Sequence, residues 1–147
     1  MTARRFGSAL FALLLLLPTS SKAQEETTIW SGVFTAEQAE RGKAIHLGVC
    51  AKCHGERGDG AGEPDQPQAP AIARATFLRN WEGQSLAGLF DYVRNTMPPD
   101  NPGSRPDQAY IDAIAYMLAL TKAPSGTMEL PPDPDALELI VVAPAPE

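Results

Sequence analysis

The chain has 147 residues and a formal net charge of −6, because 18 acidic residues outnumber 12 basic ones. Its length fits one domain of ordinary size and leaves no room for a second. An acidic surface repels nucleic acid and anionic membranes, so neither is expected as a partner.

The first 23 residues have the pattern of a cleaved secretory signal peptide. Two arginines precede an apolar stretch from 6 to 17, which is shorter than the roughly 20 residues that a membrane-spanning helix needs. Small residues favour cleavage after Ala23, and an uncleaved anchor is the alternative. Cleavage there leaves residues 24–147 as a periplasmic chain without an integral membrane segment. The net charge of this chain is −9, because the presequence holds three basic residues and no acidic one.

An extended lead-in at residues 24–34 precedes the first predicted helix. Thr35 is followed three residues later by Gln38, a capping box that predicts a helix running toward Gly48. Gly42 lies inside this helix, where it weakens helix stability but permits close approach of another helix or of a ring.

Two further helices are predicted, and no stretch has a strand pattern that competes with them. One has Ser85 as its N-cap and ends at the proline pair that begins with Pro98. The other begins near residues 104–107 and ends near Leu120, with an apolar face wide enough for a well-buried helix.

Two further segments are rich in proline, and the first of them is also rich in glycine. Residues 55–71 are predicted to form a folded loop without a long regular element. The acidic, Pro-rich tail at 122–147 either wraps the domain or is partly disordered. We therefore expect one all-α domain at 24–121, preceded by the signal peptide and followed by this tail.

The strongest chemical signal is the run Cys50-Ala51-Lys52-Cys53-His54. It matches C-x-x-C-H, the attachment signature of c-type haem. On a helical turn the two thiols and the imidazole share a face, so the thiols can meet the two haem vinyl groups while the imidazole reaches the iron. The motif predicts one covalent haem c, attached through Cys50 and Cys53 and bound by His54.

Three other uses of a cysteine pair are a structural disulfide, a zinc half-site and a thioredoxin-like dithiol. Zinc prefers four ligands, but the chain offers two cysteines and two histidines, and His46 is poorly spaced from His54 for a closed site. A thioredoxin-like motif follows a strand, whereas this one follows a predicted helix. The motif and the secretion signal together favour haem.

Met97 is the leading candidate for the second axial iron ligand. The prolines that follow it disfavour helical geometry at Met97 and stiffen the loop, which reduces the entropy lost when sulfur meets iron. The alternative role of Met97 is to fill a gap in the core. Among its competitors, Met117 belongs to a helix face and is expected in the core, Met128 lies in the tail, and His46 is expected at the solvated surface of the first helix.

With these motifs, the sequence resembles the class I cytochrome c family, and within it the small periplasmic cytochromes that accompany PQQ-dependent (quinoprotein) alcohol or sugar dehydrogenases. The resemblance covers most of the chain after the presequence. The residues that carry it are Trp30–Gly42, Cys50–Gly55, Pro70–Ile72, Trp81, Thr96–Pro99 and Ala115-Tyr116.

The resemblance implies a cytochrome c fold, in which three main helices and their loops surround one covalent haem. The first and last helices would cross at close range, with Gly42 facing the ring of Tyr116. The Pro70 carbonyl would accept a hydrogen bond from the distal nitrogen of His54, fixing its tautomer. Trp81 would lie near a haem propionate, and a core aromatic is its alternative role.

The expected function is one-electron transfer rather than enzyme catalysis. The donor would be a dehydrogenase and the acceptor an oxidase or another cytochrome, with the chain acting as a free carrier or as the cytochrome subunit of a dehydrogenase complex. The alternative is a haem-based sensor or peroxidase-like enzyme with an open sixth iron site. A third hypothesis is a structural subunit whose tail anchors a larger complex.

Overall fold

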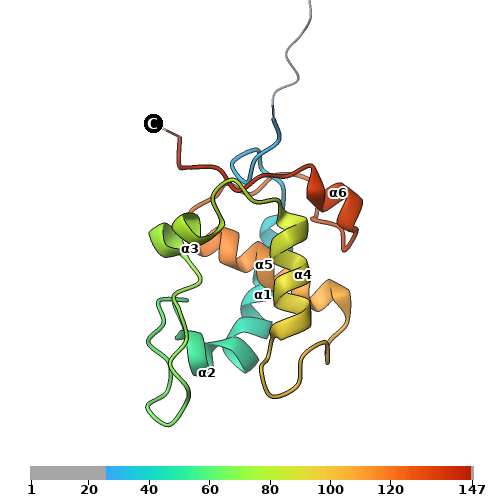
Figure 1. Ribbon diagram of the computed structural model, residues 1–147. Helices are drawn as coiled ribbons and strands as arrows, with labels where there is room; N and C mark the ends of the chain where they lie inside the picture. The colour runs from blue at the N-terminus through green and yellow to red at the C-terminus, as the bar shows by residue number, and fades with distance from the viewer. Residues whose placement is uncertain (1–25, 147) are drawn as a thin grey trace, which may run out of the picture.

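The structure is a computed structural model, and it describes residues 26–146. The elements in chain order are α1 (Ala36–Ile45), the π-helical turn η1 (His46–Cys50), α2 (Ala51–His54), α3 (Arg74–Trp81), α4 (Leu86–Thr96), α5 (Asp107–Leu120) and α6 (Pro134–Glu138) (Figure 1). Over this range the β contacts are two isolated bridges, both made by Val141, so the predicted all-α fold is confirmed. The predicted signal peptide and its cleavage site lie outside the described residues.

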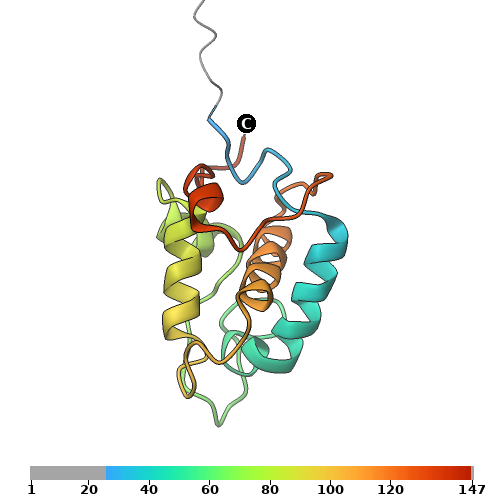
Figure 2. The same cartoon turned by 90° about the vertical axis from the view of Figure 1, so that its right-hand side faces the viewer.

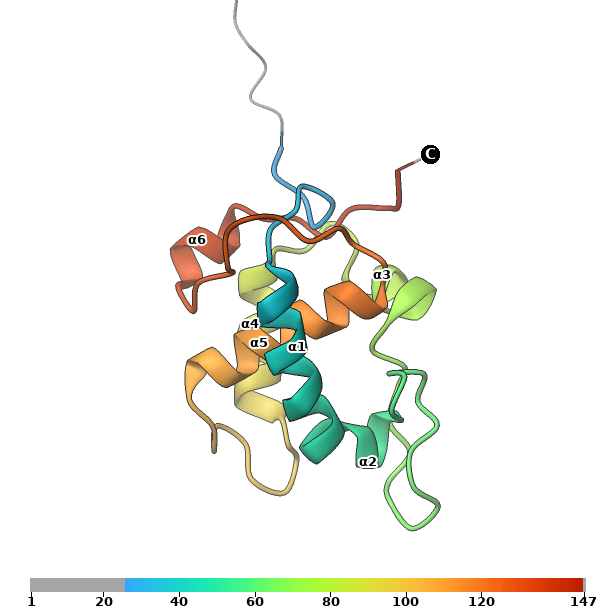
Figure 3. The same cartoon turned by 180° about the vertical axis from the view of Figure 1, so that it is seen from behind.

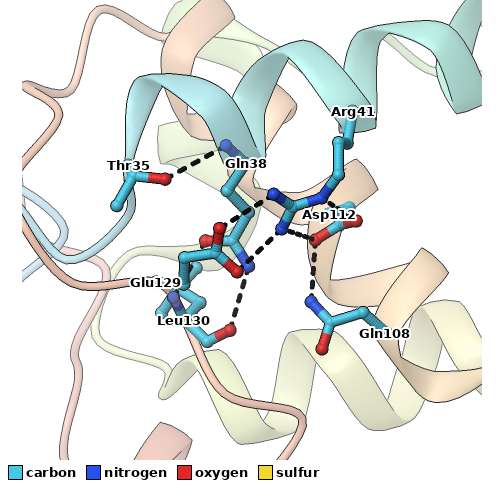
Figure 4. A network of polar contacts seen from close by, with 7 residues as sticks. All are labelled: Thr35, Gln38, Arg41, Gln108, Asp112, Glu129 and Leu130. Atoms are coloured by element: carbon cyan, nitrogen blue, oxygen red, sulfur yellow. Dashed lines mark hydrogen bonds and ion pairs between the residues drawn. The ribbon is translucent and has the colours of Figure 1, made fainter.

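Helix α1 begins where the sequence predicts, but only half of the predicted capping box forms. The Thr35 hydroxyl accepts a hydrogen bond from the Gln38 backbone N–H at 3.1 Å. The Gln38 side chain is fully buried and does not return to Thr35. Its amide instead donates to the Leu130 carbonyl at 2.9 Å and accepts from the Leu130 N–H at 2.8 Å (Figure 4). The Gln38 side chain, which the capping box predicts to bond back to Thr35, therefore binds the distant tail residue Leu130 instead.

Helices α1 and α5 cross, with α4 on the other side of α5 (Figures 2 and 3). Gly42 lies at the crossing, where a Cβ atom would overlap the Asp112 carbonyl and lie 3.0 Å from the Cβ of Tyr116. The predicted close approach is confirmed. The predicted contact of Gly42 with the ring of Tyr116 is only partly right. Gly42 lies against the Cβ of Tyr116, whereas the ring packs on His46, with ring centroids 5.2 Å apart.

The two later helices also follow the sequence. The Ser85 hydroxyl accepts from the Gly88 N–H at 3.3 Å and caps α4. This helix ends at Met97, whose backbone is extended with φ −122° and ψ 145°, as the prolines after it require. Helix α5 is buried on most of its surface and forms the centre of the core.

Helix α3 was not predicted, because its start lacks a local signal. Its N-cap is Ala73, which has no side chain that can cap, and Arg74 has the unusual positive φ of 58°. The Arg74 N–H is bound instead by the hydroxyl of Thr121, at 3.0 Å. This helix begins with a contact to a residue 47 positions later, which no local pattern reveals.

The tail wraps the end of the molecule opposite α2 (Figures 1 and 3). We call residues 122–143 the C-terminal strap. Three of its apolar side chains, Leu130, Leu137 and Val142, are no more than 1% exposed. Its backbone pairs with the lead-in, where the N–H of Ile29 donates to Val141 O at 3.0 Å and the side chain of Ile29 is fully buried. Of the two alternatives for the tail, the strap adopts the wrapped one.

Charged side chains also connect the strap to α1 and α5 (Figure 4). The Arg41 guanidinium donates two hydrogen bonds to the Glu129 carboxylate, at 2.8 and 2.7 Å, and two to Asp112, at 3.0 and 3.1 Å. Gln108 donates a further bond to Asp112 at 2.8 Å. One arginine thus connects two helices with the strap. Within residues 26–146 no helix has the length and apolarity to cross a membrane.

Candidate haem-binding site

The two cysteines lie on the helical path that continues α1 without a break. Cys50 ends η1 and Cys53 lies in α2, one turn later. Both thiols are free and neither residue is fully buried. Burial raises the pKa of the Cys50 thiol, and the positive charge of Arg105 only partly opposes this, so the thiol is protonated at neutral pH.

His54 has the tautomer that a metal-binding imidazole needs. Its Nδ1 lies 2.8 Å from the Pro70 carbonyl oxygen, so the hydrogen bond that the resemblance implies is present. Because a carbonyl only accepts, Nδ1 carries the hydrogen and Nε2 of the neutral ring keeps its lone pair. Within residues 26–146, Nε2 has no hydrogen-bond partner of its own. The residue as a whole is buried, with 8% of its surface exposed.

Residues 55–71, which we call the ligand loop, hold the backbone of this turn. The N–H of Glu63 donates to the Lys52 carbonyl and that of Gly60 to the His54 carbonyl, each at 2.7 Å. At Gly62 a Cβ atom would overlap the carbonyls of Lys52 and Cys53, so only glycine fits there. The prediction of a folded loop is confirmed, and its fold wraps the turn that carries the thiols and the imidazole.

Met97 is held through its backbone from two helices. Its N–H donates to the Val93 carbonyl at 2.9 Å, and its own carbonyl accepts from the hydroxyl of Tyr110 at 3.0 Å. The residue is partly exposed at the C-terminal end of α4. Sequence reasoning missed Tyr110, since nothing local relates a tyrosine of α5 to the carbonyl of a methionine 13 residues earlier.

The competitors of Met97 have quite different surroundings. Met117 is 5% exposed in α5, which confirms its expected place in the core, whereas Met128 is 76% exposed on the strap. His46 was expected at the solvated surface, and this expectation is wrong, because the residue is only 1% exposed. Its Nε2 lies 2.8 Å from the Gly55 carbonyl oxygen, and burial lowers its pKa.

Trp81 ends α3 and is half-buried against the core. Its ring meets Tyr92 edge to face, with centroids 5.5 Å apart at an interplanar angle of 63°. Among the described side chains and backbone groups, no acceptor receives its indole N–H. This placement agrees with a core role for the ring and leaves the N–H available to a ligand.

The residues present fit a covalent haem better than the other uses of a cysteine pair. The two thiols form no disulfide, and no strand precedes the motif in the described chain. Residues 26–146 contain no cluster of three or more His, Cys, Asp or Glu side chains that could hold a metal ion. Two free thiols and an imidazole with a free Nε2 on one helical turn are the donor set of a c-type haem.

An all-α domain with this turn is a cytochrome c domain. The family model described as "Cytochrome C oxidase, cbb3-type, subunit III" matches residues 37–117, more than half of the chain, and the chain belongs to this family. No curated protein and no solved structure matches it. The protein is therefore an electron carrier with one covalently attached haem c, whose iron supplies reversible one-electron transfer.

Proposed function

We propose that the chain is a periplasmic monohaem carrier in which Cys50 and Cys53 attach the haem and His54 and Met97 are the axial iron ligands. The observation that carries this proposal is the geometry of His54, whose Nδ1 is fixed by Pro70 while Nε2 has no partner among the described residues. A carbonyl that fixes the tautomer also makes an imidazole a better ligand.

Met97 and Met128 are the exposed or partly exposed methionines of residues 26–146, and Met97 is the better supported ligand. Its backbone is already held by Val93 and Tyr110, so little further ordering is needed for a weak thioether ligand to bind. Met128 lies on the strap without such restraints. Histidine and methionine together raise the reduction potential and leave no open iron position, which suits transfer rather than catalysis.

Trp81 contributes a hydrogen-bond donor in the same proposal. Its free indole N–H suits a propionate oxygen of the haem, while its ring packs against the core and Tyr92. A hydrogen bond from the Trp81 N–H to a propionate would hold that edge of the haem without any contact with the iron.

The physiological donor in this proposal is a dehydrogenase of the quinoprotein class. The resemblance to cytochromes that accompany such enzymes supports this donor. The family description names a subunit of an oxidase, which supports a respiratory oxidase, or a cytochrome that serves it, as the acceptor. Purified carrier should be reduced by a PQQ-dependent dehydrogenase and its substrate, and by no NAD-dependent dehydrogenase tested under the same conditions; equal reduction by both would reject the donor class.

The acidic surface should govern how fast the partners meet. Donor and acceptor are expected to present basic patches to a chain of net charge −6, or −9 without its presequence. Attraction between exposed charges is screened by salt, so the second-order transfer rate should fall as ionic strength rises. Rates that stay flat across ionic strength would contradict this model of the partners.

The visible spectrum of the holoprotein tests the ligand set, with and without carbon monoxide. The ferric form should be low-spin with a weak red sulfur-to-iron band, and the ferrous form should not bind carbon monoxide. Met97→Ala should lose the red band and bind carbon monoxide. The matched control Met128→Ala should keep the wild-type spectrum, because this side chain is 76% exposed.

A high-spin wild-type spectrum that shifts with carbon monoxide would overturn the carrier proposal. It would assign Met97 to packing and favour the sensor or peroxidase-like alternative with an open iron site. Loss of the red band in Met128→Ala instead of Met97→Ala would replace the assigned ligand and keep the carrier.

A further inference from the structure

His46 lies in the one part of the long helical path that departs from α-helical geometry. In η1 the Ala51 N–H donates to the His46 carbonyl, five residues back, whereas the N–H of His46 still bonds to the carbonyls of Gly42 and Lys43 in α1. Single π-helical turns inside helices are rare and are frequent at functional sites. This turn leads directly into the residues that attach the haem.

The side chain of His46 reaches the far end of the same turn. Its Nε2 lies 2.8 Å from the Gly55 carbonyl oxygen, which also accepts the Gly58 N–H at 3.0 Å. Because the carbonyl only accepts, Nε2 carries the hydrogen of the neutral ring. The ring of Tyr116 packs against the imidazole and His46 is almost fully buried, so the bond is shielded from water.

Gly55 follows His54 immediately and has a φ of 77°. A glycine in this left-handed region has no Cβ to restrict rotation of its peptide, so its orientation depends on the groups that bind its carbonyl. A carbonyl bound by a buried imidazole cannot turn without breaking a bond that water does not replace. The backbone on the C-terminal side of His54 is thereby held by the side chain of His46 in addition to the Gly58 N–H.

We propose that His46 is a positioning residue for the haem ligand His54. The inference rests on the proposed function, in which Nε2 of His54 binds the iron. His54 is held at two points: Pro70 fixes its ring through Nδ1, and His46 fixes the peptide that follows it through Gly55. Together the two bonds fix the orientation of the imidazole plane when Nε2 binds the iron.

Electron paramagnetic resonance of the ferric holoprotein tests this role, because its g-values report the orientation of an axial imidazole. His46→Phe keeps a ring against Tyr116 but cannot donate to Gly55. Its spectrum should show shifted or broadened g-values. His46→Gln keeps an N–H donor and should return the g-values toward those of the wild type. If Phe prevents haem attachment, His46→Leu takes its place beside His46→Gln.

Tyr116→Leu is the matched control for packing. It removes the ring that packs on His46 but leaves the bond to Gly55, so it should lower the thermal midpoint and keep the wild-type g-values. Wild-type g-values in His46→Phe, or the same shift in Tyr116→Leu as in His46→Phe, would overturn the positioning role. A wild-type spectrum without low-spin signals would instead reject the proposed function, and the role of His46 with it.

Discussion

The ligand loop at one end of the molecule and the C-terminal strap at the other have similar compositions but are held in different ways. Both are rich in proline and in acidic residues, and neither contains a long helix. The ligand loop has few buried side chains and is ordered by backbone bonds to the turn that carries His54. The strap buries Leu130, Leu137 and Val142 and adds the charged network around Arg41.

The difference shows that proline content alone does not decide whether a segment is ordered. A segment without buried apolar side chains gains little from the hydrophobic effect and depends on what it surrounds. A segment with apolar residues at suitable intervals becomes part of the core. The ligand loop should therefore depend on the haem, whereas the strap should depend on its own side chains.

The largest effect is expected when haem attachment is removed. Replacing Cys50 and Cys53 together by alanine should give a poorly folded protein, because the haem supplies a large apolar body that the ligand loop does not provide. Thermal unfolding followed by circular dichroism should lose its cooperative transition, compared with the wild-type holoprotein. A cooperative, native-like transition in the variant would show that the domain folds without haem.

A single core side chain tests the strap. Leu130→Ala should lower the free energy of unfolding of the holoprotein by about 2–5 kcal/mol, because it removes a buried side chain and leaves a cavity. Leu139→Ala is the matched control on the same segment. Its side chain is 72% exposed, so the change should be below about 0.5 kcal/mol. Urea unfolding measures both, and equal effects would mean that the strap is not part of the core.

Substitutions at two glycines, one in the ligand loop and one in the strap, should affect stability alike but the haem spectrum differently. A Cβ atom at Gly62 would overlap the carbonyls of Lys52 and Cys53 in the haem-attachment motif. One at Gly126 in the strap would overlap the carbonyl of Gly32 in the lead-in. Each substitution to alanine should cost about 1–3 kcal/mol through overpacking. Gly62→Ala should also alter the haem spectrum, whereas Gly126→Ala should leave it unchanged.

Gly88→Ala is the control for this pair. Gly88 lies in α4, and a Cβ atom there would lie 3.9 Å from the Ser85 hydroxyl, which is an ordinary contact. Alanine in a helix is favoured over glycine, so this variant should be no less stable than the wild type. If Gly126→Ala changed the haem spectrum as much as Gly62→Ala, the two ends of the molecule would not be independent.

The features that local sequence predicts are those that local physics decides. Helices α1, α4 and α5 have a capping hydroxyl, an apolar repeat or a proline stop, and the haem motif lies within five residues. The first N–H of helix α3 is bound by Thr121, and the side chain of Gln38 is bound by Leu130. The start of α3 and the placement of Gln38 therefore depend on residues far along the chain. The same limit explains why His46 was expected at the surface, since its burial depends on Tyr116 and Gly55.

The smallest effect concerns the charge of Asp112, which connects α5 to α1 beneath the strap. Burial raises the pKa of this carboxyl, but hydrogen bonds from Arg41 and Gln108 outweigh it and hold the pKa below its ordinary 3.8. A depressed carboxyl pKa stabilises the fold above the unfolded value, and the contribution is lost as pH falls through the folded value. Asp112→Asn should therefore cost about 1 kcal/mol at pH 7, because Arg41 stays partly exposed and screened.

Near pH 3, below the ordinary carboxyl pKa of 3.8, the difference between Asp112→Asn and the wild type should begin to shrink, because the unfolded wild-type chain then binds a proton that the folded state holds less tightly. Glu129 also has a lowered pKa from its bonds to Arg41, but it titrates in both proteins and largely cancels in the comparison. Glu40→Gln is the control, because its pair with Lys43 is exposed and 3.5 Å apart, and it should change stability by less than about 0.5 kcal/mol. Urea unfolding of the holoproteins at the two pH values measures these differences. A cost for Asp112→Asn that is the same at both would mean that Asp112 acts through its shape, and that the strap is held by its apolar side chains without help from this charge.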